Sequence, residues 1–272
     1  MIEGYRELLP SAPLDAYVHR MAYVYFAFPL PPERLAPDSY VKLSLIFDGE
    51  PQYFDSTGAS VPWHDGFCGH VPPGQGIIAT SDGPVRAMMA NFYPSGFHRL
   101  FGVPVGRFNG RMVVPKEVLG DQAEVLYHDL RSIDDPERRL QCLEAFLLKR
   151  VEKVHTPEPT VMQRVEDHVR ATKGMAPVTE LAGIANMSVR QLERKAVTEL
   201  GLSPKAFSSV VRFNHAYAIM QRTRTLDLDV ALACGYYDES HLLRDLAYYL
   251  GDAPKSFVNL IRPMVDLSLG HQ

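Results

Sequence analysis

Cysteine is scarce in this chain of 272 residues, and the three that occur, Cys68, Cys142 and Cys234, lie far apart. An odd number of widely spaced thiols argues against a disulfide framework and favours a reducing compartment. The first ten residues lack the basic start and apolar run of a signal peptide. No segment approaches the roughly 18 apolar residues of a membrane span. We therefore expect a cytoplasmic protein with no membrane partner.

A large excess of one charge is also missing, because 28 Lys and Arg face 32 Asp and Glu for a net charge of −4. Whole-chain charge thus gives no argument for a nucleic-acid partner. The sequence has no Gly-x-Ser-x-Gly, P-loop or Gly-x-Gly-x-x-Gly motif, so nothing in it indicates an enzyme or a cofactor. Its 46% hydrophobic and 22% charged residues are typical of a globular protein. The length fits one large domain or two ordinary ones.

The amino-terminal half predicts a β-rich domain with helices at its end. Short β-prone runs alternate with turn signals such as Asp48-Gly49 and Asp82-Gly83, which is typical of a sandwich or barrel. The predicted strands cover residues 21–28, 41–47, 76–80 and 85–93. We expect all-β structure to about residue 115. A helix should then begin at Asp135-Pro136 and pack back on the barrel or on a partner subunit, with one apolar face formed by Leu140, Leu143, Leu147 and Val151.

The carboxy-terminal half has helical patterns almost throughout. The stiff segment Thr156-Pro-Glu-Pro-Thr160 sets the predicted boundary between a domain of residues 1–156 and one of residues 157–272. Two stretches, 178–188 and 228–240, resemble each other: each has a short apolar helix, a turn and a polar residue that opens a second helix. They predict two helix-turn-helix units, at residues 179–200 and 227–250. A long helix from Ser203-Pro204 to about Gln221 should join them.

These residues give the chain a resemblance to transcription regulators of the AraC/XylS type. The resemblance covers about 100 residues and rests on Leu181-Ala182, Ser188, Leu192, Gly201-Leu-Ser-Pro204, Arg212, Ala216, Ala231, Cys234-Gly235-Tyr236, Asp238, Ser240-His241, Arg244, Gly251 and Pro254. It implies an α+β protein of two domains, with a cupin-like β-barrel before an all-α DNA-binding domain. Tyr93-Pro-Ser-Gly-Phe97 is the best motif of the barrel. The resemblance also implies double-stranded DNA as a partner, a homodimer, and contact with RNA polymerase or a small-molecule effector.

The candidate DNA-binding residues open the second helix of each unit, the helix that enters the major groove. They are Ser188, Val189, Arg190, Gln191 and Arg194 in the first unit, and Ser240, His241 and Arg244 in the second. Ser188 is expected to cap the first recognition helix, and Asp238 or Glu239 the second. Gln191 could recognise adenine, and either arginine of the first unit could recognise guanine or hold a phosphate.

Charge and packing depart from this pattern. From Glu158 to Gln272 there are 13 Lys and Arg and 13 Asp and Glu, whereas DNA-binding domains normally carry a basic excess. The second recognition helix has one arginine and three acids, so we expect the first unit to do most of the base reading. Ala196, Leu242 and Leu246 stand where the family usually has aromatic core residues. Ala196 could leave a looser first unit.

Effector residues are harder to infer. Aromatic side chains could line a pocket, although alternating aromatics also suit a half-buried sheet. Basic side chains within strands could bind an anion, although an outward-facing position explains them as well. The candidates are Tyr23, Tyr25, Lys42, Trp63 and Arg86.

A metal site is not expected, and two alternatives to an effector-controlled regulator stay open. His64, Cys68 and His70 share one loop, but the paired histidines of a metal-binding cupin are missing, so we expect no metal. A protein-interaction regulator with weakened DNA binding would fit the neutral helical domain. A cupin-type enzyme with a helical accessory domain is the third reading, and a tightly bound metal would favour it.

Overall fold

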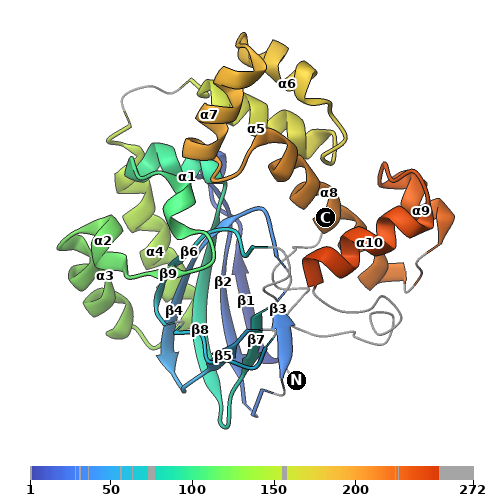
Figure 1. Ribbon diagram of the computed structural model, residues 1–272. Coiled ribbons are helices and arrows are strands. Elements are labelled where there is room, and N and C mark those ends of the chain that lie inside the picture. The colour runs from blue at the N-terminus through green and yellow to red at the C-terminus, as the bar shows by residue number, and fades with distance from the viewer. Residues whose placement is uncertain are drawn as a thin grey trace.

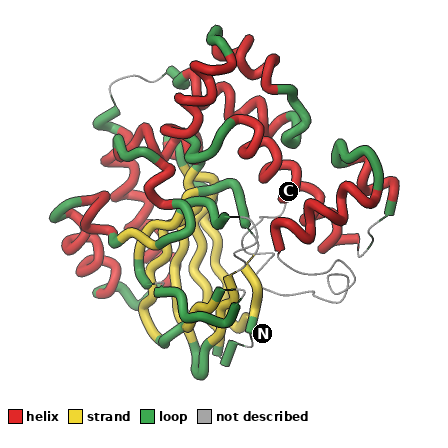
Figure 2. Tube along the Cα trace, in the orientation of Figure 1, coloured by secondary structure: helices red, strands yellow, loops and turns green. Residues whose placement is uncertain are grey.

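The computed structural model describes residues 2–27, 29–30, 32–35, 37–55, 57–62, 64–72, 77–154, 158–223, 225 and 227–250. Within these ranges, the amino-terminal half forms two antiparallel sheets, and helices dominate from Pro94 onward (Figures 1 and 2). The predicted α+β class with two helix-turn-helix units is confirmed. The predicted boundary near residue 156 and the side chain of Trp63 fall outside the described residues. None of the described helices is long and apolar enough to cross a bilayer.

The larger sheet has six strands in the order β1-β2-β8-β4-β6-β9, and the smaller has the order β3-β7-β5. Their bounds are β1 Ile2–Leu8, β2 Val18–Phe26, β3 Glu33–Leu35, β4 Val41–Asp48, β5 Gln52–Phe54, β6 Gly66–Cys68, β7 Ile77–Thr80, β8 Val85–Phe92 and β9 Met112–Val113. The four predicted strands are confirmed as β2, β4, β7 and β8. The other five are too short, or too mixed in sequence, to stand out.

The central strands β2 and β8 are buried on both faces, because their side chains alternate between two hydrophobic clusters. Val24 and Ala87 face the smaller sheet, and Met21 and Met88 face a layer of helices on the other side. Double burial explains why these strands are almost continuously apolar in sequence. The prediction of all-β structure to residue 115 was wrong, since a helix already begins at Pro94.

Helices cover one face of the larger sheet, at the left of Figure 1. The elements are the 3₁₀ turns η1 Leu14–Ala16 and η2 Val105–Phe108, and the helices α1 Pro94–Phe101, α2 Pro115–Leu119, α3 Gln122–Arg131 and α4 Pro136–Val151. Asp135 caps α4, as predicted, by accepting a hydrogen bond from the Arg138 amide at 2.8 Å. The apolar stripe of α4, with Leu140, Leu143 and Leu147 fully buried, packs on this chain's own sheet.

The carboxy-terminal half contains α5 Val161–Ala171, α6 Val178–Ala185, α7 Val189–Glu199, α8 Pro204–Thr223, α9 Leu228–Ala233 and α10 Glu239–Leu250. The pairs α6–α7 and α9–α10 are the two predicted helix-turn-helix units, and α8 is the predicted connecting helix. Each unit has its own buried cluster. Ala196, Leu242 and Leu246 are fully buried, and Phe207 of α8 lies in the same cluster as Ala196. An aromatic side chain from the connecting helix thus packs in the core of the first unit.

Candidate nucleic-acid interface and effector pocket

The first recognition helix, α7, begins with a capping box at Ser188. The Gln191 amide donates to Ser188 Oγ at 3.3 Å, and Gln191 Oε1 accepts from the Ser188 amide at 3.0 Å. The two residues therefore satisfy backbone donors that a helix start leaves open. The predicted cap is confirmed. The cap also occupies the amide oxygen that Gln191 would need for a bidentate contact with adenine.

Arg190 and Arg194 lie one turn apart on α7 and are both exposed. Neither forms an ion pair with another described residue, whereas Lys195 on the same helix is paired with Glu199. Two unpaired guanidinium groups at i and i+4 on an exposed helix face are free to meet base edges or phosphates. Val189 is also partly exposed, at 38%. The structure brings the first set of predicted DNA contacts together at the start of one helix, and their role stays a prediction.

The second recognition helix, α10, is preceded by Asp238, whose carboxylate accepts a hydrogen bond from the His241 amide at 2.7 Å. Ser240 and Arg244 are exposed, as predicted. The ring of His241 is half-buried and lies edge-on to Tyr236, with centroids 5.1 Å apart. The structure also exposes Tyr237, at 87%, in the turn before α10. No pattern in the sequence singled out this exposed side chain.

Most of the acidic charge of α10 is already engaged within the protein. Asp245 pairs with Arg212 of α8 at 3.5 Å, and the Arg212 guanidinium lies 4.9 Å from the ring centroid of Tyr236. Asp238 serves as the helix cap. Glu239 is the one of the three acids that is exposed and has no such contact with the described residues. The second unit therefore presents less negative charge to DNA than its sequence suggests.

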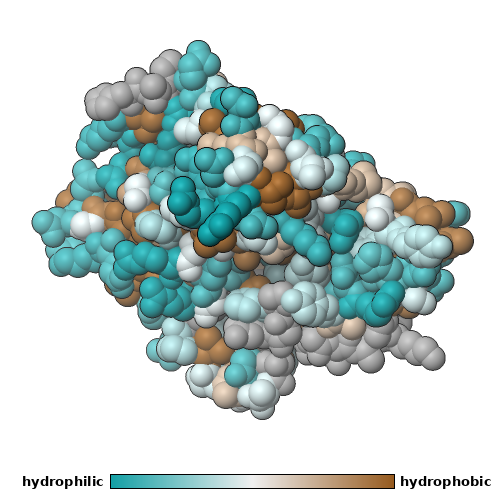
Figure 3. Space-filling view, turned by 45° about the horizontal axis from the view of Figure 1, so that its top comes forward, coloured by the Kyte–Doolittle hydropathy of each residue, from teal (hydrophilic) through white to brown (hydrophobic). Residues whose placement is uncertain are grey.

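The surface around the two units carries many hydrophilic residues, with hydrophobic ones between them (Figure 3). Hydrophobic residues appear at the side of the molecule where α9 lies, and there Leu228 and Leu232 are 50% and 54% exposed. Cys234, at the end of α9, is fully buried, and burial raises the pKa of its thiol. Cys234 thus serves as a small buried residue in the core of the second unit.

Hydrogen bonds that are buried or partly buried join α5 and the end of the first unit to the amino-terminal domain. Asn109 donates to the carbonyl of Gly201 at 2.8 Å, and the Glu166 carboxylate accepts from the amide of Ser95 at 2.9 Å. Gly201 has a φ of +80°, and a β-carbon on it would lie 2.8 Å from Val105. The close approach explains the glycine at this position of the motif.

His70 also lies in this interface, where its ring nitrogens approach two carbonyl oxygens. Nδ1 is 3.1 Å from the Asp38 carbonyl, and Nε2 is 2.8 Å from the Leu200 carbonyl. Both nitrogens of His70 are therefore engaged with backbone. Of the other two residues once considered as metal ligands, Cys68 is buried and His64 is exposed beside the Asp65 carbonyl. Within the described ranges, no group of three His, Cys, Asp or Glu side chains could hold a metal ion.

A cleft of about 210 Å³ lies beside this interface and includes His19, Tyr40, Tyr93 and Arg170 in its lining. The imidazole of His19 stacks on Tyr40 with centroids 4.8 Å apart and lies 3.2 Å from the Tyr93 hydroxyl. Burial, followed by the charges of Arg20 and Arg170, lowers the pKa of His19 from 6.5 to about 4, against a weaker opposite effect of Asp38. The folded protein therefore keeps this ring neutral.

We expect His19 to make the protein less stable in mild acid. Between pH 6.5 and about 4 the unfolded chain binds a proton at this position and the folded chain does not, so stability falls as the pH falls through this window. The full loss should be about 3 kcal/mol. Urea unfolding of His19→Gln across this range should show a flatter pH dependence than the parent, whereas exposed His128→Gln should match it. Parallel curves for the parent and His19→Gln would contradict the prediction.

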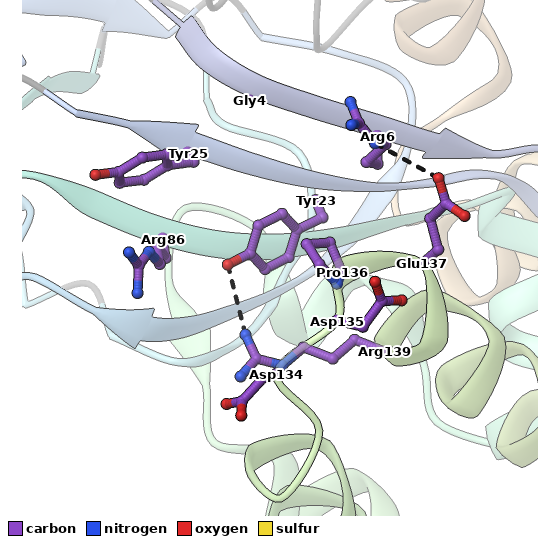
Figure 4. A pocket seen from close by; sticks show the side chains of 10 residues that line it. All are labelled: Gly4, Arg6, Tyr23, Tyr25, Arg86, Asp134, Asp135, Pro136, Glu137 and Arg139. Carbon is purple, nitrogen blue, oxygen red and sulfur yellow. Dashed lines mark hydrogen bonds and ion pairs between the residues drawn. The ribbon is translucent and has the colours of Figure 1, made fainter.

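A larger cavity of about 610 Å³ lies between the sheet and the start of α4 (Figure 4). It brings together three of the five predicted effector residues, Tyr23, Tyr25 and Arg86, with Arg6 and Arg139. Lys42 is not part of it, because its ammonium group pairs with the buried Asp38. Cavities of this size suit small organic ligands.

Comparison with known proteins supports the identification of the two helix-turn-helix units. Residues 181–259 match a helix-turn-helix domain family. The HTH-type transcriptional regulator MtrA of Neisseria gonorrhoeae is 34% identical over 64 residues, or 24% of this chain and 21% of that protein. This match spans about a fifth of the length of the relative.

Two solved structures are similar to the chain at lower sequence identity. ToxT from Vibrio cholerae O395 is 13% identical over 89% of this chain and 98% of its own, with a TM-score of 0.47. A probable AraC family transcriptional regulator from Rhodopseudomonas palustris CGA009 is 28% identical over 38% of this chain and 98% of its own, with a TM-score of 0.33. The match of residues 181–259 to a helix-turn-helix family and the similarity to a transcriptional regulator confirm the resemblance to AraC/XylS-type regulators.

Proposed function

We propose that the protein is a sequence-specific DNA-binding transcription regulator. The observation that carries this proposal is α7, a capped helix in a helix-turn-helix unit that exposes two unpaired arginines at its start. Such a helix can lie in a major groove and reach base edges with its first turns. The amino-terminal domain modulates this activity by binding a small-molecule effector or by forming a dimer.

The test of this function is selection of binding sites from a random duplex-DNA pool with the intact protein. We expect an enriched motif whose affinity falls steeply with salt, because each neutralised phosphate contributes a slope of about −0.9 to log K against log[salt]. A salt-independent interaction, or no enrichment at low salt in the presence and absence of cell metabolites, would instead favour the protein-interaction regulator. The family match favours either regulator over the cupin-type enzyme.

We expect the two units to contribute unequally to binding. Arg190 has no side-chain partner among the residues that the structure describes, whereas Arg244 Nε already donates to the Ser240 carbonyl at 3.2 Å, beside the exposed Glu239. Arg190→Ala should therefore weaken binding to the selected site about tenfold or more, and Arg244→Ala clearly less. Titration of both variants by fluorescence anisotropy measures the difference. Equal losses would show that the second unit reads bases as strongly as the first.

A further inference from the structure

We propose that the cavity between the sheet and α4 binds a small organic monocarboxylate with a flat apolar body. The proposal starts from Arg139, which is only 8% exposed although it carries a permanent positive charge. Its Nε donates to the Leu130 carbonyl at 3.1 Å, and its Nη1 lies 3.5 Å from the Tyr23 hydroxyl. No carboxylate among the described residues pairs with it.

The other two arginines of the cavity are more exposed than Arg139, and each is paired with a carboxylate of the protein. Arg6 is paired with Glu137 at 3.5 Å, and Arg86 with Asp48 at 3.8 Å, and each is about half exposed. Exposed pairs of this kind are weak and open easily. A buried guanidinium without a carboxylate is costly, so a carboxylate from outside the protein would be bound well at Arg139.

Aromatic rings define the rest of the ligand. The Arg139 guanidinium lies 4.2 Å from the ring centroid of Phe47, and that of Arg86 lies 4.8 Å from the ring centroid of Tyr25. These ring faces are already occupied by cations of the protein, which disfavours an organic cation as ligand. Tyr25, and the small exposed part of Tyr23, still line the cavity with aromatic ring surface that a flat apolar body can contact.

The rim limits the charge that the ligand can carry. Asp134, Asp135 and Glu137 all line the cavity and are exposed, the first two just before α4 and Glu137 in its first turn (Figure 4). Asp135 is held as the helix cap and Glu137 is paired with Arg6, which leaves Asp134 as an uncompensated negative charge. A second anionic group on the ligand would be repelled by Asp134. A monoanion therefore fits better than a dicarboxylate or a phosphate ester.

The site lies apart from the space between the two sheets, because Tyr23 and Phe47 belong to the cluster that the helices cover. Residues that face the smaller sheet, such as Val24 and Ala87, form a different cluster. Carboxylate binding itself follows from this geometry. Its role as an effector signal rests on the proposed function as a regulator.

Calorimetric titration of the full chain with trans-cinnamate, and with its uncharged analogue cinnamamide, tests the site without DNA. We expect cinnamate to bind with a dissociation constant of about 1 mM or tighter and cinnamamide to bind at least about tenfold more weakly. The dianion isophthalate should also bind more weakly than cinnamate. Equal binding of cinnamate and cinnamamide, or no heat with cinnamate at several times that concentration, would overturn the proposal.

Matched variants then locate the bound probe. Arg139→Gln should weaken cinnamate binding about ten- to hundredfold, whereas the neighbouring exposed Arg138→Gln should leave it unchanged. Arg139 is buried, so its replacement can also disturb folding. Arg86 is exposed, and Arg86→Gln therefore provides a second variant that should fold normally and weaken binding at least about threefold. Binding unaffected by Arg86→Gln and Tyr23→Phe would place cinnamate elsewhere and contradict the site. The effector role is tested separately, by measuring whether cinnamate changes the affinity of the protein for its selected DNA.

Discussion

Replacement of both Arg190 and Arg194 by alanine should remove the enriched motif from a random-pool selection. The two side chains share one exposed face of α7 and have no partners among the described residues, so their loss should not disturb the fold. A bidentate contact between arginine and guanine contributes about 1–3 kcal/mol of discrimination. Two such contacts imply at least about a thirtyfold loss of affinity for the selected site. Circular dichroism should show unchanged helix content.

The matched control for this variant is Lys195→Ala, which removes one positive charge from the same helix. Lys195 is half-buried and paired with Glu199, so we expect a small effect on DNA binding. A motif that survives in the double variant would show that α7 does not read bases. A motif lost equally in Lys195→Ala would show that net charge, rather than the two exposed side chains, controls the affinity.

The two helix-turn-helix units could be predicted from the sequence because their signals are local. Ser188 and Asp238 cap the amino-terminal ends of α7 and α10. Asn186 ends α6 in the left-handed conformation that asparagine tolerates. The charge of α10 could not be judged in the same way. Asp245 lies against Arg212, 33 residues earlier in the chain, and only the fold shows that this acid faces α8.

The interface between the domains was not predictable, since its contacts join residues far apart in sequence. His70 and Leu200 are separated by 130 positions, and Asn109 and Gly201 by 92. A histidine near a cysteine suggested a metal ligand, whereas the structure engages both its nitrogens with backbone carbonyls. The effector residues were predicted in part. Alternation placed Tyr23 and Tyr25 on one face of β2, but nothing in the sequence indicated that Arg139 of α4 lies opposite them.

Glu166→Ala should cause the largest loss of stability among single changes at the domain interface. This carboxylate is 1% exposed, accepts from the Ser95 amide at 2.9 Å, and pairs with Arg170 at 2.7 Å. Arg170 also donates to the Ser39 carbonyl at 2.8 Å. Burial is the largest single effect and lowers the pKa of Arg170, but Glu166, Tyr40 and Tyr93 together raise it, so the net shift is upward. Removal of Glu166 leaves a buried guanidinium unpaired, which costs about 3–5 kcal/mol.

Two measurements separate unfolding from release of the DNA-binding domain. Urea unfolding should show the lower stability of Glu166→Ala, with Glu193→Ala, an exposed acid on α7, within about 0.5 kcal/mol of the parent. Hydrogen exchange should show whether protection is lost first in the segment around Leu200 and Gly201, which bonds to His70 and Asn109. Because Arg190 and Arg194 are already exposed in the docked arrangement, the released domain should still bind DNA. Loss of DNA binding in a folded Glu166→Ala protein would instead show that docking positions α7 for recognition, and that the interface is part of the reading mechanism.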